Sequence, residues 1–282
     1  MTDLDHLLAF IREDAPFGDI TSEAVIGDAR CRAVIVTRAG GVIAGLEETT
    51  LLFQHFGVMV ERSVCDGETV IGGTVVMDLD GQARSILLVE RTALNIIGRM
   101  SGIATRTRIM ATLLERTGCS CRISATRKTA PGLRALDKKA VVLGGGEPHR
   151  ANLSEGILIK DNHLALVPLE QAVCSAKQVP LPLKIEVEVA GPAEAVAAAE
   201  AGADILLLDN MTPGMVKSTL TLLEEKGLRD ALLIEVSGGI TEENLVSYAL
   251  PGVDLISSGA LTHSVRNFDV SLEIIPGDRI FP

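Results

Sequence analysis

Beyond Gly118, short apolar runs alternate along the chain with longer segments of helical spacing. Each run is rich in Val, Ile and Leu, the composition of strands that are covered on both faces. The runs occupy residues 121–124, 156–160, 184–189, 204–208, 232–236 and 254–257, and helical spacing is clearest at 192–201, 213–226 and 242–250. Strands and helices that alternate at this spacing predict βαβ units and a parallel sheet.

The first part of the chain has a different pattern, in which the alternation is irregular. The pattern predicts a helix over 3–13, a break at 16–19, an extended turn at 20–22, a helix over 47–56, and strands at 30–38, 58–64, 69–71 and 74–79. From Ser85 the spacing becomes helical, and we expect a kink near Gly98 or Ser101-Gly102 before a second helix over 106–117. This mixture is typical of an α+β arrangement.

Polar side chains stand at or just after the ends of the predicted parallel strands. They are Lys160, Glu188, Asp209, Ser237 and Ser258. Functional groups at the carboxyl ends of successive parallel strands are the pattern of a β/α barrel, whose active site lies on that face. A doubly wound open sheet is the alternative, and the repeated strand-end chemistry favours the barrel.

The composition restricts the class of protein. Of the 282 residues, 47% are hydrophobic and only 2% aromatic, so the core must be aliphatic. A net charge of −11 and the shortage of rings for base stacking argue against a nucleic-acid partner. The five cysteines have no paired spacing and are expected to be reduced. The chain starts without a basic or apolar targeting region, and no apolar run reaches the ~20 residues of a membrane span. We therefore expect a cytoplasmic protein that has no membrane partner.

One stretch opposes the acidic average of the chain. From residue 122 to residue 160 there are eight basic and three acidic residues, a local charge balance of +5. The basic residues are Arg122, Arg127, Lys128, Arg134, Lys138, Lys139, Arg150 and Lys160, and the acidic residues are Asp137, Glu147 and Glu155. The guanidinium of Arg binds carboxylates and phosphates through two parallel hydrogen bonds, and Lys adds a mobile positive charge. This basic island therefore predicts a site for a small polyanion. The alternative is a solvated basic face, which is less suited to residues at the ends of apolar runs.

Small residues directly follow the last two predicted strands. They are Ser237, Gly238 and Gly239 after one strand, and Ser258, Gly259 and Ala260 after the other. Glycine lets backbone N–H groups approach a phosphate, and barrels commonly bind phosphate after their last two strands. The two segments therefore predict a phosphate cradle.

Carboxylates come from two neighbouring strands. Glu186 and Glu188 share one side of their strand, and Glu188 is nearer the end; Asp209 ends the next strand. Beside a phosphate site, Glu188 and Asp209 are expected to contact ribose hydroxyls or Mg²⁺, which prefers a few carboxylates together with phosphate oxygens. The alternative is that these acids pair with Lys160 or Lys184 for structural reasons.

Lys160 and His149 each have two interpretations. A lysine at the end of a barrel strand could form a Schiff base, as in aldolases, or bind an anion. The neighbouring basic residues favour anion binding by Lys160. His149 could act as a general base, but beside Arg150 it is better suited to donate a hydrogen bond to an anion.

Ten motifs spread over nearly the whole chain together resemble the quinolinate phosphoribosyltransferase family. In order they are Phe17-Gly-Asp-Ile-Thr21, Glu90-Arg-Thr-Ala-Leu-Asn95, Ser101-Gly-Ile-Ala-Thr105, Thr126-Arg-Lys-Thr129 with Pro131-Gly132, Gly144-Gly-Gly146 with His149-Arg150, Leu158-Ile-Lys-Asp-Asn-His163, Glu186-Val-Glu188, Leu208-Asp-Asn210, Ser237-Gly-Gly-Ile240 and Gly259-Ala-Leu-Thr262.

This resemblance implies an α/β protein with an incomplete β/α (TIM-like) barrel and an N-terminal α/β sandwich domain. The implied boundaries are 1–105 for the N-terminal domain with a long connecting helix, 106–265 for the barrel phosphoribosyltransferase domain, and 266–282 for a segment that packs back on the N-terminal domain. The resemblance also implies a homodimer, or a multiple of dimers, with shared active sites in which Arg91 enters the partner's barrel.

The resemblance further implies the reaction and the role of each site residue. A phosphoribosyl group passes from 5-phosphoribosyl-1-diphosphate to the nitrogen of quinolinate, and decarboxylation gives nicotinate mononucleotide. Lys160, Glu188 and Asp209 would be catalytic, and the two acids would hold Mg²⁺ mostly through water or substrate. Arg127, His149 and Arg150 would bind the quinolinate carboxylates. The other substrate-binding positions would be Thr126, Lys128, Ser237, Gly238, Gly239, Ser258, Gly259 and Ala260.

One position departs from the family pattern. Many members have Asp before Thr-Arg-Lys-Thr, where this chain has Ala125. A related group linked to molybdenum uptake also lacks that Asp, but it departs at the segment 158–163, which this chain retains. That group is the alternative of the same fold. A Schiff-base aldolase that uses Lys160 and a non-catalytic phosphosugar-binding barrel are the alternatives from other classes.

Overall fold

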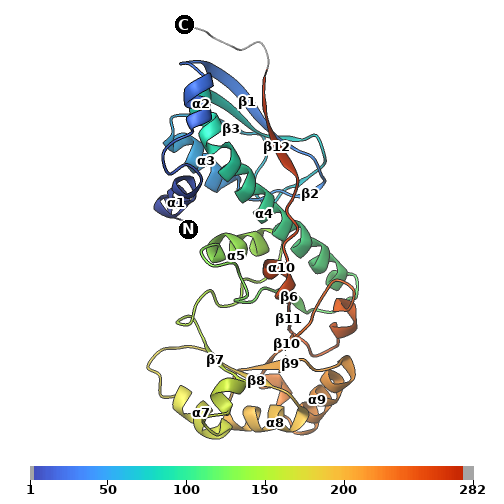
Figure 1. Ribbon diagram of the computed structural model, residues 1–282. Helices are drawn as coiled ribbons and strands as arrows, with labels where there is room; N and C mark the ends of the chain where they lie inside the picture. Colours follow the sequence, from blue (N-terminus) through green and yellow to red (C-terminus); the bar gives the residue numbers. More distant parts are fainter. Residues whose placement is uncertain (1–2, 276–282) are drawn as a thin grey trace. The chain divides into compact units, whose positions relative to one another are not determined.

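The computed structural model describes residues 3–275, which fold as two compact units (Figure 1). The first unit contains residues 3–108, 135–145 and 265–275, and the second contains residues 109–134 and 146–264. Three separated stretches of sequence therefore build the first unit.

An antiparallel sheet organises the first unit, with the strand order β12-β1-β5-β3. Its strands are β1 (Arg30–Thr37), β3 (Met59–Arg62), β5 (Val75–Gln82) and β12 (Val270–Ile274), and β2 (Gly41–Val42) pairs separately with β4 (Thr69–Val70). Ile35 of β1 stands opposite Leu272 of β12, so a late segment of the chain forms one edge of this sheet. The C-terminal segment expected over 266–282 continues into residues 276–282, which lie outside the described residues.

The core of the first unit is mainly aliphatic, with Phe53 and Phe268 as its buried aromatic residues. Helices α1 (Leu4–Asp14) and α3 (Leu46–His55) contribute Leu7 and Phe53, and the sheet contributes Ile35 and Met77; all four are fully buried. Burying side chains of this size stabilises the fold by about 1.5–3 kcal/mol each. The sandwich of helices and sheet predicted for the N-terminal region is therefore confirmed.

The extended turn predicted at residues 20–22 is wrong, because this segment begins the short helix α2 (Ile20–Val25). The Asp19 carboxylate caps the helix and accepts hydrogen bonds of 3.1 Å from the backbone N–H groups of Thr21 and Ser22. The Ser22 hydroxyl also donates to Asp19, and this bond contributes most to lowering the Asp19 pKa. An Asp at this position is a strong start signal for a helix, and it follows the break correctly predicted at 16–19.

The predicted kink and second helix after Ser85 are also wrong, because residues Ala83–Glu115 form one helix, α4. Its glycines permit close packing and do not interrupt the helix. A Cβ atom added to Gly98 would lie 3.0 Å from the carbonyl oxygen of Phe268, and one added to Gly102 would lie 2.2 Å from that of Arg266. Glycine at these positions therefore lets the returning chain lie directly against the helix backbone.

Helix α5 (Arg134–Leu143) was not predicted, and it removes part of the basic island from the candidate site. Residues 135–143 belong to the first unit. There, the carboxylate of fully buried Asp137 forms two bonds with Arg99, of 2.7 and 2.9 Å. Nζ of Lys139 lies 2.7 Å from carboxylate oxygens of both Glu47 and Glu48. These charges are therefore structural.

A six-stranded parallel sheet forms the second unit and confirms the predicted α/β class. The strand order is β6-β11-β10-β9-β8-β7, and the strands are β6 (Arg122–Ser124), β7 (Ile157–Ile159), β8 (Ile185–Val189), β9 (Ile205–Asp209), β10 (Leu233–Ser237) and β11 (Leu255–Ser257). Within residues 3–275 no ladder joins the edge strands β6 and β7. Because a complete β/α barrel has eight strands, this open sheet agrees with the expected incomplete barrel.

Short helices follow these strands. They are α6 (Asp161–Leu164), α7 (Leu169–Ala176), α8 (Pro192–Ala201), α9 (Pro213–Glu225) and α10 (Ala260–His263), with 3-10 turns at Arg229–Ala231 and Leu245–Tyr248. Helices α7, α8 and α9 lie side by side along one face of the sheet (Figure 1). The helix predicted at 242–250 is wrong apart from its 3-10 turn. Asn244 holds a tight turn there, since its side chain accepts a bond from the Thr241 N–H and donates one to the Gly239 carbonyl.

Two further expectations concern the chain as a whole. All five cysteines are free thiols. In the part of the chain that the structure describes, every helix is too short or too polar to cross a membrane.

Candidate active site

A pocket of about 480 Å³ opens at the carboxyl ends of the parallel strands in the second unit. All six strands, or the segments directly after them, supply lining residues, and the segment that leads to β7 adds two more. The lining residues are Ala125, Thr126, Arg127, Lys128, His149, Arg150, Leu158, Lys160, Glu188, Leu207, Asp209, Asn210, Glu235, Ser237, Gly238, Gly239 and Ser257. This is the face on which β/α barrels place their active sites.

The pocket brings together most of the site residues that the sequence analysis named. Those in the lining are Thr126, Arg127, Lys128, His149, Arg150, Lys160, Glu188, Asp209, Ser237, Gly238 and Gly239. They come from distant parts of the chain and meet because parallel strands align their carboxyl ends at one edge of the sheet.

Four of the named residues do not line this pocket. Arg91 is exposed on α4 in the first unit. Ser258 is buried and its hydroxyl donates to the carbonyl of Ile240 at 2.7 Å, so it is already engaged. A Cβ on Gly259 would lie 2.9 Å from Cδ of Lys128, so Gly259 leaves room for that lysine, and Ala260 begins α10.

The acidic side of the pocket is formed by Glu188 and Asp209. Nζ of Lys160 lies 3.4 Å from Oε2 of Glu188. Burial raises the pKa of Glu188; the charge of Lys160 opposes this shift and that of Asp209 adds to it. The backbone N–H of Lys160 donates to Nδ1 of His163 at 2.9 Å, so His163 supports the turn that carries the lysine. Schiff-base lysines lie in apolar surroundings or beside another cation, whereas Lys160 has a carboxylate partner, which favours anion binding.

The loop after β10 approaches the loop after β9 closely. Asn210 has a left-handed backbone with φ 53°, and its N–H donates to the carbonyl of Ser237 at 2.9 Å. Gly238 has φ 101°, and a Cβ there would lie 2.2 Å from Oδ1 of Asn210 and 2.7 Å from its backbone nitrogen. Only glycine permits this approach, which places the predicted phosphate segment 237–239 beside Asp209.

The basic side of the pocket is formed by Arg127, Lys128 and Arg150. Nε of Arg127 is buried and has no hydrogen-bond partner among the described residues. Burial lowers the pKa of Arg150, and the charge of Arg127 lowers it further. Nη1 of Arg150 donates to the carbonyl of Gly156 at 3.1 Å, which fixes part of the guanidinium. Two neighbouring arginines with an unsatisfied buried donor are suited to bind a dianion.

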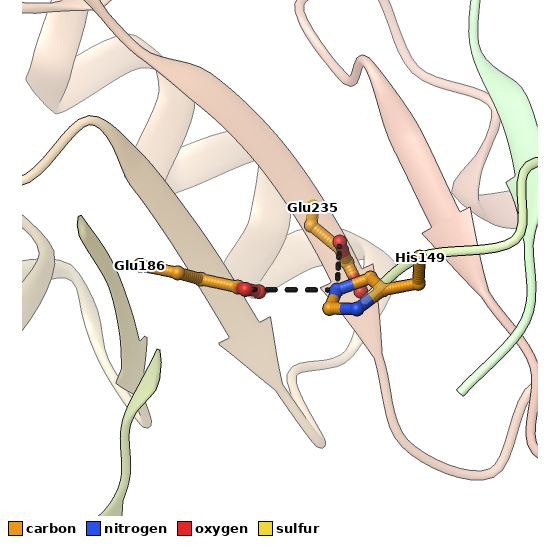
Figure 2. Close-up of side chains that lie close together, drawn as sticks. All are labelled: His149, Glu186 and Glu235. Carbon is orange, nitrogen blue, oxygen red and sulfur yellow. Dashed lines mark ion pairs between the residues drawn. The ribbon is translucent and has the colours of Figure 1, made fainter. Parts of the chain in front are cut away.

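His149 also lines the pocket and contacts two buried glutamates (Figure 2). Its Nε2 lies 3.2 Å from Oε2 of Glu235 and 3.5 Å from Oε2 of Glu186, and both carboxylates are almost fully buried. Burial alone lowers the His149 pKa, but the hydrogen bonds and charges of the two glutamates outweigh it and raise the pKa to about 9. Burial also raises the Glu186 pKa, a shift that Glu235 reinforces and His149 opposes.

Several lining residues were not among the site residues predicted from the sequence. Glu235, Asn210 and Ser257 are the polar ones, and Ala125, Leu158 and Leu207 are the apolar ones. A signal for Glu235 was present: it shares one face of β10 with Ser237, because side chains alternate along a strand. Only Glu188 of the two glutamates on this strand was predicted to face the pocket. Glu186 lies further from the strand end on the same face, and its carboxylate faces His149.

The sequence also matches a known family along most of its length. Residues 19–101 match the description "Quinolinate phosphoribosyl transferase, N-terminal domain", and residues 103–273 match the corresponding C-terminal domain. The chain therefore belongs to the quinolinate phosphoribosyl transferase family, and the resemblance in its ten motifs is confirmed.

Individual relatives are similar over almost the entire chain. The probable nicotinate-nucleotide pyrophosphorylase (carboxylating) of Methanothermobacter thermautotrophicus is 47% identical over 274 residues, covering 96% of this chain and 98% of the relative. That of Archaeoglobus fulgidus is 44% identical, covering 92% and 99%. The crystal structure of nicotinate-nucleotide pyrophosphorylase from Ehrlichia chaffeensis is 31% identical and superposes with a TM-score of 0.91, covering 98% of this chain and 99% of that one.

Proposed function

We propose that this chain is a carboxylating nicotinate-nucleotide pyrophosphorylase, an enzyme of NAD biosynthesis. It transfers the phosphoribosyl group of 5-phosphoribosyl-1-diphosphate to the nitrogen of quinolinate and releases diphosphate and CO₂, which leaves nicotinate mononucleotide. The observation that carries this proposal is one pocket lined both by two arginines, of which Arg127 has a buried Nε–H without a partner in the described chain, and by the carboxylates of Glu188 and Asp209. The molybdenum-linked alternative is not favoured by the names of the curated relatives.

The basic side of the pocket binds quinolinate. Arg127 and Arg150 hold its two carboxylates, and the buried Nε–H of Arg127 gains the acceptor that it lacks within the described chain. Charge-assisted bonds of this kind are short and directional, so they fix the ring with its nitrogen toward the acidic side. Thr126 and Lys128, which lie on the same segment, contact the phosphate groups of the second substrate.

The acidic side of the pocket stabilises the ribosyl group during transfer. The bond from C1 of the ribose to the diphosphate breaks as the ring nitrogen approaches, and positive charge develops on the sugar. Glu188 and Asp209 oppose this charge, and Lys160 stabilises the departing diphosphate. Ser237, Gly238 and Gly239 bind the 5′-phosphate through a glycine-rich turn at the end of β10. The bond from C2 to its carboxylate then breaks and CO₂ leaves; the adjacent positively charged ring nitrogen stabilises the electron pair on C2 until that carbon takes a proton from solvent.

The residues present are suited to Mg²⁺. The donors at this end of the pocket are the carboxylates of Glu188 and Asp209, both oxygen ligands, and the Asp209 charge is close enough to raise the Glu188 pKa. A hard cation that is shared with substrate phosphates needs such a sparse oxygen set. When bound, Mg²⁺ would neutralise diphosphate charge, and Glu188 and Asp209 would hold it mostly through water or substrate.

The proposal includes a homodimer, or a multiple of dimers, that works in the cytoplasm. Arg91 is exposed on α4 and absent from the pocket lining, and we assign it to the active site of a second copy. Mixing Arg91→Ala with Lys160→Ala chains tests this assignment, because hybrid dimers would contain one intact site. Recovery of roughly a quarter to a half of the wild-type rate is expected, and no recovery in verified hybrids would contradict a shared site.

A turnover assay tests the function. Quinolinate, 5-phosphoribosyl-1-diphosphate and Mg²⁺ should give nicotinate mononucleotide and CO₂ in equal amounts, whereas nicotinate in place of quinolinate should give no product. Arg127→Met should abolish turnover, and Arg122→Met is the matched control, because exposed Arg122 pairs with Glu147 and does not line the pocket. No product from folded wild-type protein would favour the molybdenum-linked relatives and make Ala125→Asp the next variant to examine.

A further inference from the structure

His149 is held in the interior of the second unit by residues from two strands that do not neighbour each other. Glu186 lies on β8 and Glu235 on β10, with β9 between them. Both carboxylates point at the same ring nitrogen of His149, Nε2 (Figure 2). His149 itself lies on an irregular segment and has a left-handed backbone with φ 53°, a conformation that is uncommon for a residue with a side chain.

The direction of these hydrogen bonds does not depend on the charge of the imidazole. Nδ1 lies 2.8 Å from the backbone nitrogen of Arg150, which favours a neutral ring with its proton on Nε2. The two carboxylates favour the imidazolium, which has a proton on both nitrogens and therefore cannot accept the Arg150 N–H bond. In either state Nε2 carries a proton and donates to Glu235 and Glu186.

These contacts fix the segment that carries Arg150. One end of the segment joins β6, because the N–H of Glu147 donates to the carbonyl of Ile123 and the N–H of Ala125 donates to that of Glu147, both at 2.9 Å. Beyond Arg150, the backbone leads over residues 151–156 to β7, the strand at the opposite edge of the sheet from β6. The His149 ring is therefore the link between this segment and the centre of the sheet.

We propose that Glu186 and Glu235 are positioning residues, which bind Nε2 of His149 and thereby fix the backbone of residues 147–150 and the guanidinium of Arg150 in the pocket. The proposal rests on the proposed function for its effect on quinolinate, since Arg150 is assigned to a quinolinate carboxylate. Its structural part, the fixed segment, stands independently of the substrate. Quinolinate binding should then depend on two glutamates through their contact with His149.

Glutamate variants test the proposal through a comparison of two Michaelis constants. Glu235→Leu removes the acceptor and should raise KM for quinolinate by about tenfold or more, because an Nε2–H near a single remaining carboxylate holds the ring poorly. KM for 5-phosphoribosyl-1-diphosphate should change by less than about threefold, since its binding groups lie outside residues 147–150 and the backbone of β10 is held on both sides by β9 and β11. Glu235→Gln should recover most of the affinity for quinolinate, because an amide oxygen still accepts from Nε2–H.

Two further variants calibrate the result. Glu186→Leu should have a smaller effect than Glu235→Leu, because its distance to Nε2 is 3.5 Å and not 3.2 Å. Glu147→Gln is the matched control: this glutamate lies on the same segment, but its side chain is exposed and pairs with Arg122. We expect unchanged constants for Glu147→Gln.

Hydrogen exchange on the free protein separates this proposal from the proposed function. Backbone amides of residues 147–156 should exchange at least about tenfold faster in Glu235→Leu than in the wild type, while those of β9 remain protected. This readout is informative even if quinolinate is not a substrate. Unchanged exchange and unchanged KM for quinolinate in Glu235→Leu would overturn the proposal, as would an equal rise of both Michaelis constants.

One competing role for the three side chains has its own test. One ligand atom each from His149, Glu186 and Glu235 lie within 4.8 Å of one another, so the cluster also resembles a metal site. Metal analysis of the purified protein, and titration with Zn²⁺ alone, should show no stoichiometric ion that depends on Glu235. A tightly bound ion that is present in the wild type and lost in Glu235→Leu would replace the proposed hydrogen bonds with a metal centre.

Discussion

Two groups of charged residues drawn from the same basic stretch of sequence have opposite properties in the structure. In the first unit, Asp137 and Lys139 of α5 each have close partners of opposite charge, at 2.7 Å in both cases. In the pocket of the second unit, Arg127 has a buried Nε–H without a partner among the described residues, and its charge lowers the Arg150 pKa. Charges that find partners inside the chain stabilise the fold, and charges left open are available to a ligand.

The two groups also differ in the geometry of their ion pairs. The carboxylate of Asp137 receives two bonds from one guanidinium, which is a rigid and directional pair. The pair between Lys160 and Glu188 is longer, at 3.4 Å, and the Lys160 side chain is about half exposed. A loosely paired lysine beside a pocket can exchange its partner for a substrate phosphate, whereas Asp137 cannot leave Arg99 without leaving a charge buried.

The largest expected effect is on catalysis by the charged residues of the pocket. Lys160→Met should lower kcat by about 100-fold or more, because the cation that we propose stabilises the leaving diphosphate is lost. The melting temperature should change little, since Glu188 is partly exposed and can be hydrated. Lys184→Met is the matched control: Lys184 is exposed and pairs with Asp204 away from the pocket. Steady-state rates and calorimetry of both variants check this, and a Lys160 variant with normal kcat would break the comparison.

The next effect is on stability and concerns the ion pair of Arg99 with buried Asp137. Asp137→Asn should lower the free energy of unfolding by about 3 kcal/mol, because it leaves the Arg99 guanidinium without its buried counterion. The folded fraction should retain normal kcat and KM. Replacing both partners with apolar residues, as in Arg99→Met with Asp137→Leu, should restore most of the stability. Urea denaturation measures this, and a loss of activity without a loss of stability would contradict a purely structural pair.

A smaller effect is expected for His149, which combines both properties. Its pKa is raised from the usual 6.5 to about 9, so the folded state favours the protonated ring. The stability from this preference is fully present below about pH 6.5 and is lost as the pH rises through about 9, amounting to at most about 3 kcal/mol. Denaturation at several pH values should show a decline for the wild type and a flatter profile for His149→Gln.

A matched histidine controls for alkaline effects elsewhere in the chain. His55 is exposed at the end of α3, so His55→Gln should leave the wild-type profile unchanged. Equal profiles for the wild type and His149→Gln would show that the two glutamates do not stabilise a charged His149.

The sequence predicted the features that depend on local pattern. Buried parallel strands have long apolar runs and few alternatives, so all six strands of the second sheet were located to within about two residues. Strand ends rich in polar residues predicted most of the pocket, because a parallel sheet gathers its carboxyl ends at one edge. The resemblance supplied the fold and the family, which the comparisons confirm.

What the sequence did not predict depends on contacts between distant segments. The basic island was treated as one site, but the chain passes residues 135–145 to the first unit, and no local signal marks that excursion. Gly98 and Gly102 were interpreted as a kink, although their purpose is visible only once residues 266–268 lie against the helix. The contacts of Glu186 and Glu235 could not be predicted from their own strands, because their partner His149 lies on a third segment of the chain.

The most direct test of the account compares Arg150→Met with Lys139→Met, two basic residues eleven positions apart in the same island. Thermal unfolding and kcat/KM for quinolinate should be measured on both. Arg150→Met should lose about 100-fold or more in kcat/KM at nearly unchanged melting temperature. Lys139→Met should lose about 2–3 kcal/mol of stability at nearly unchanged kcat/KM, because Glu48 is left buried without its partner. If both variants lost activity and stability together, the division of this island into structural and ligand-binding charges would be wrong.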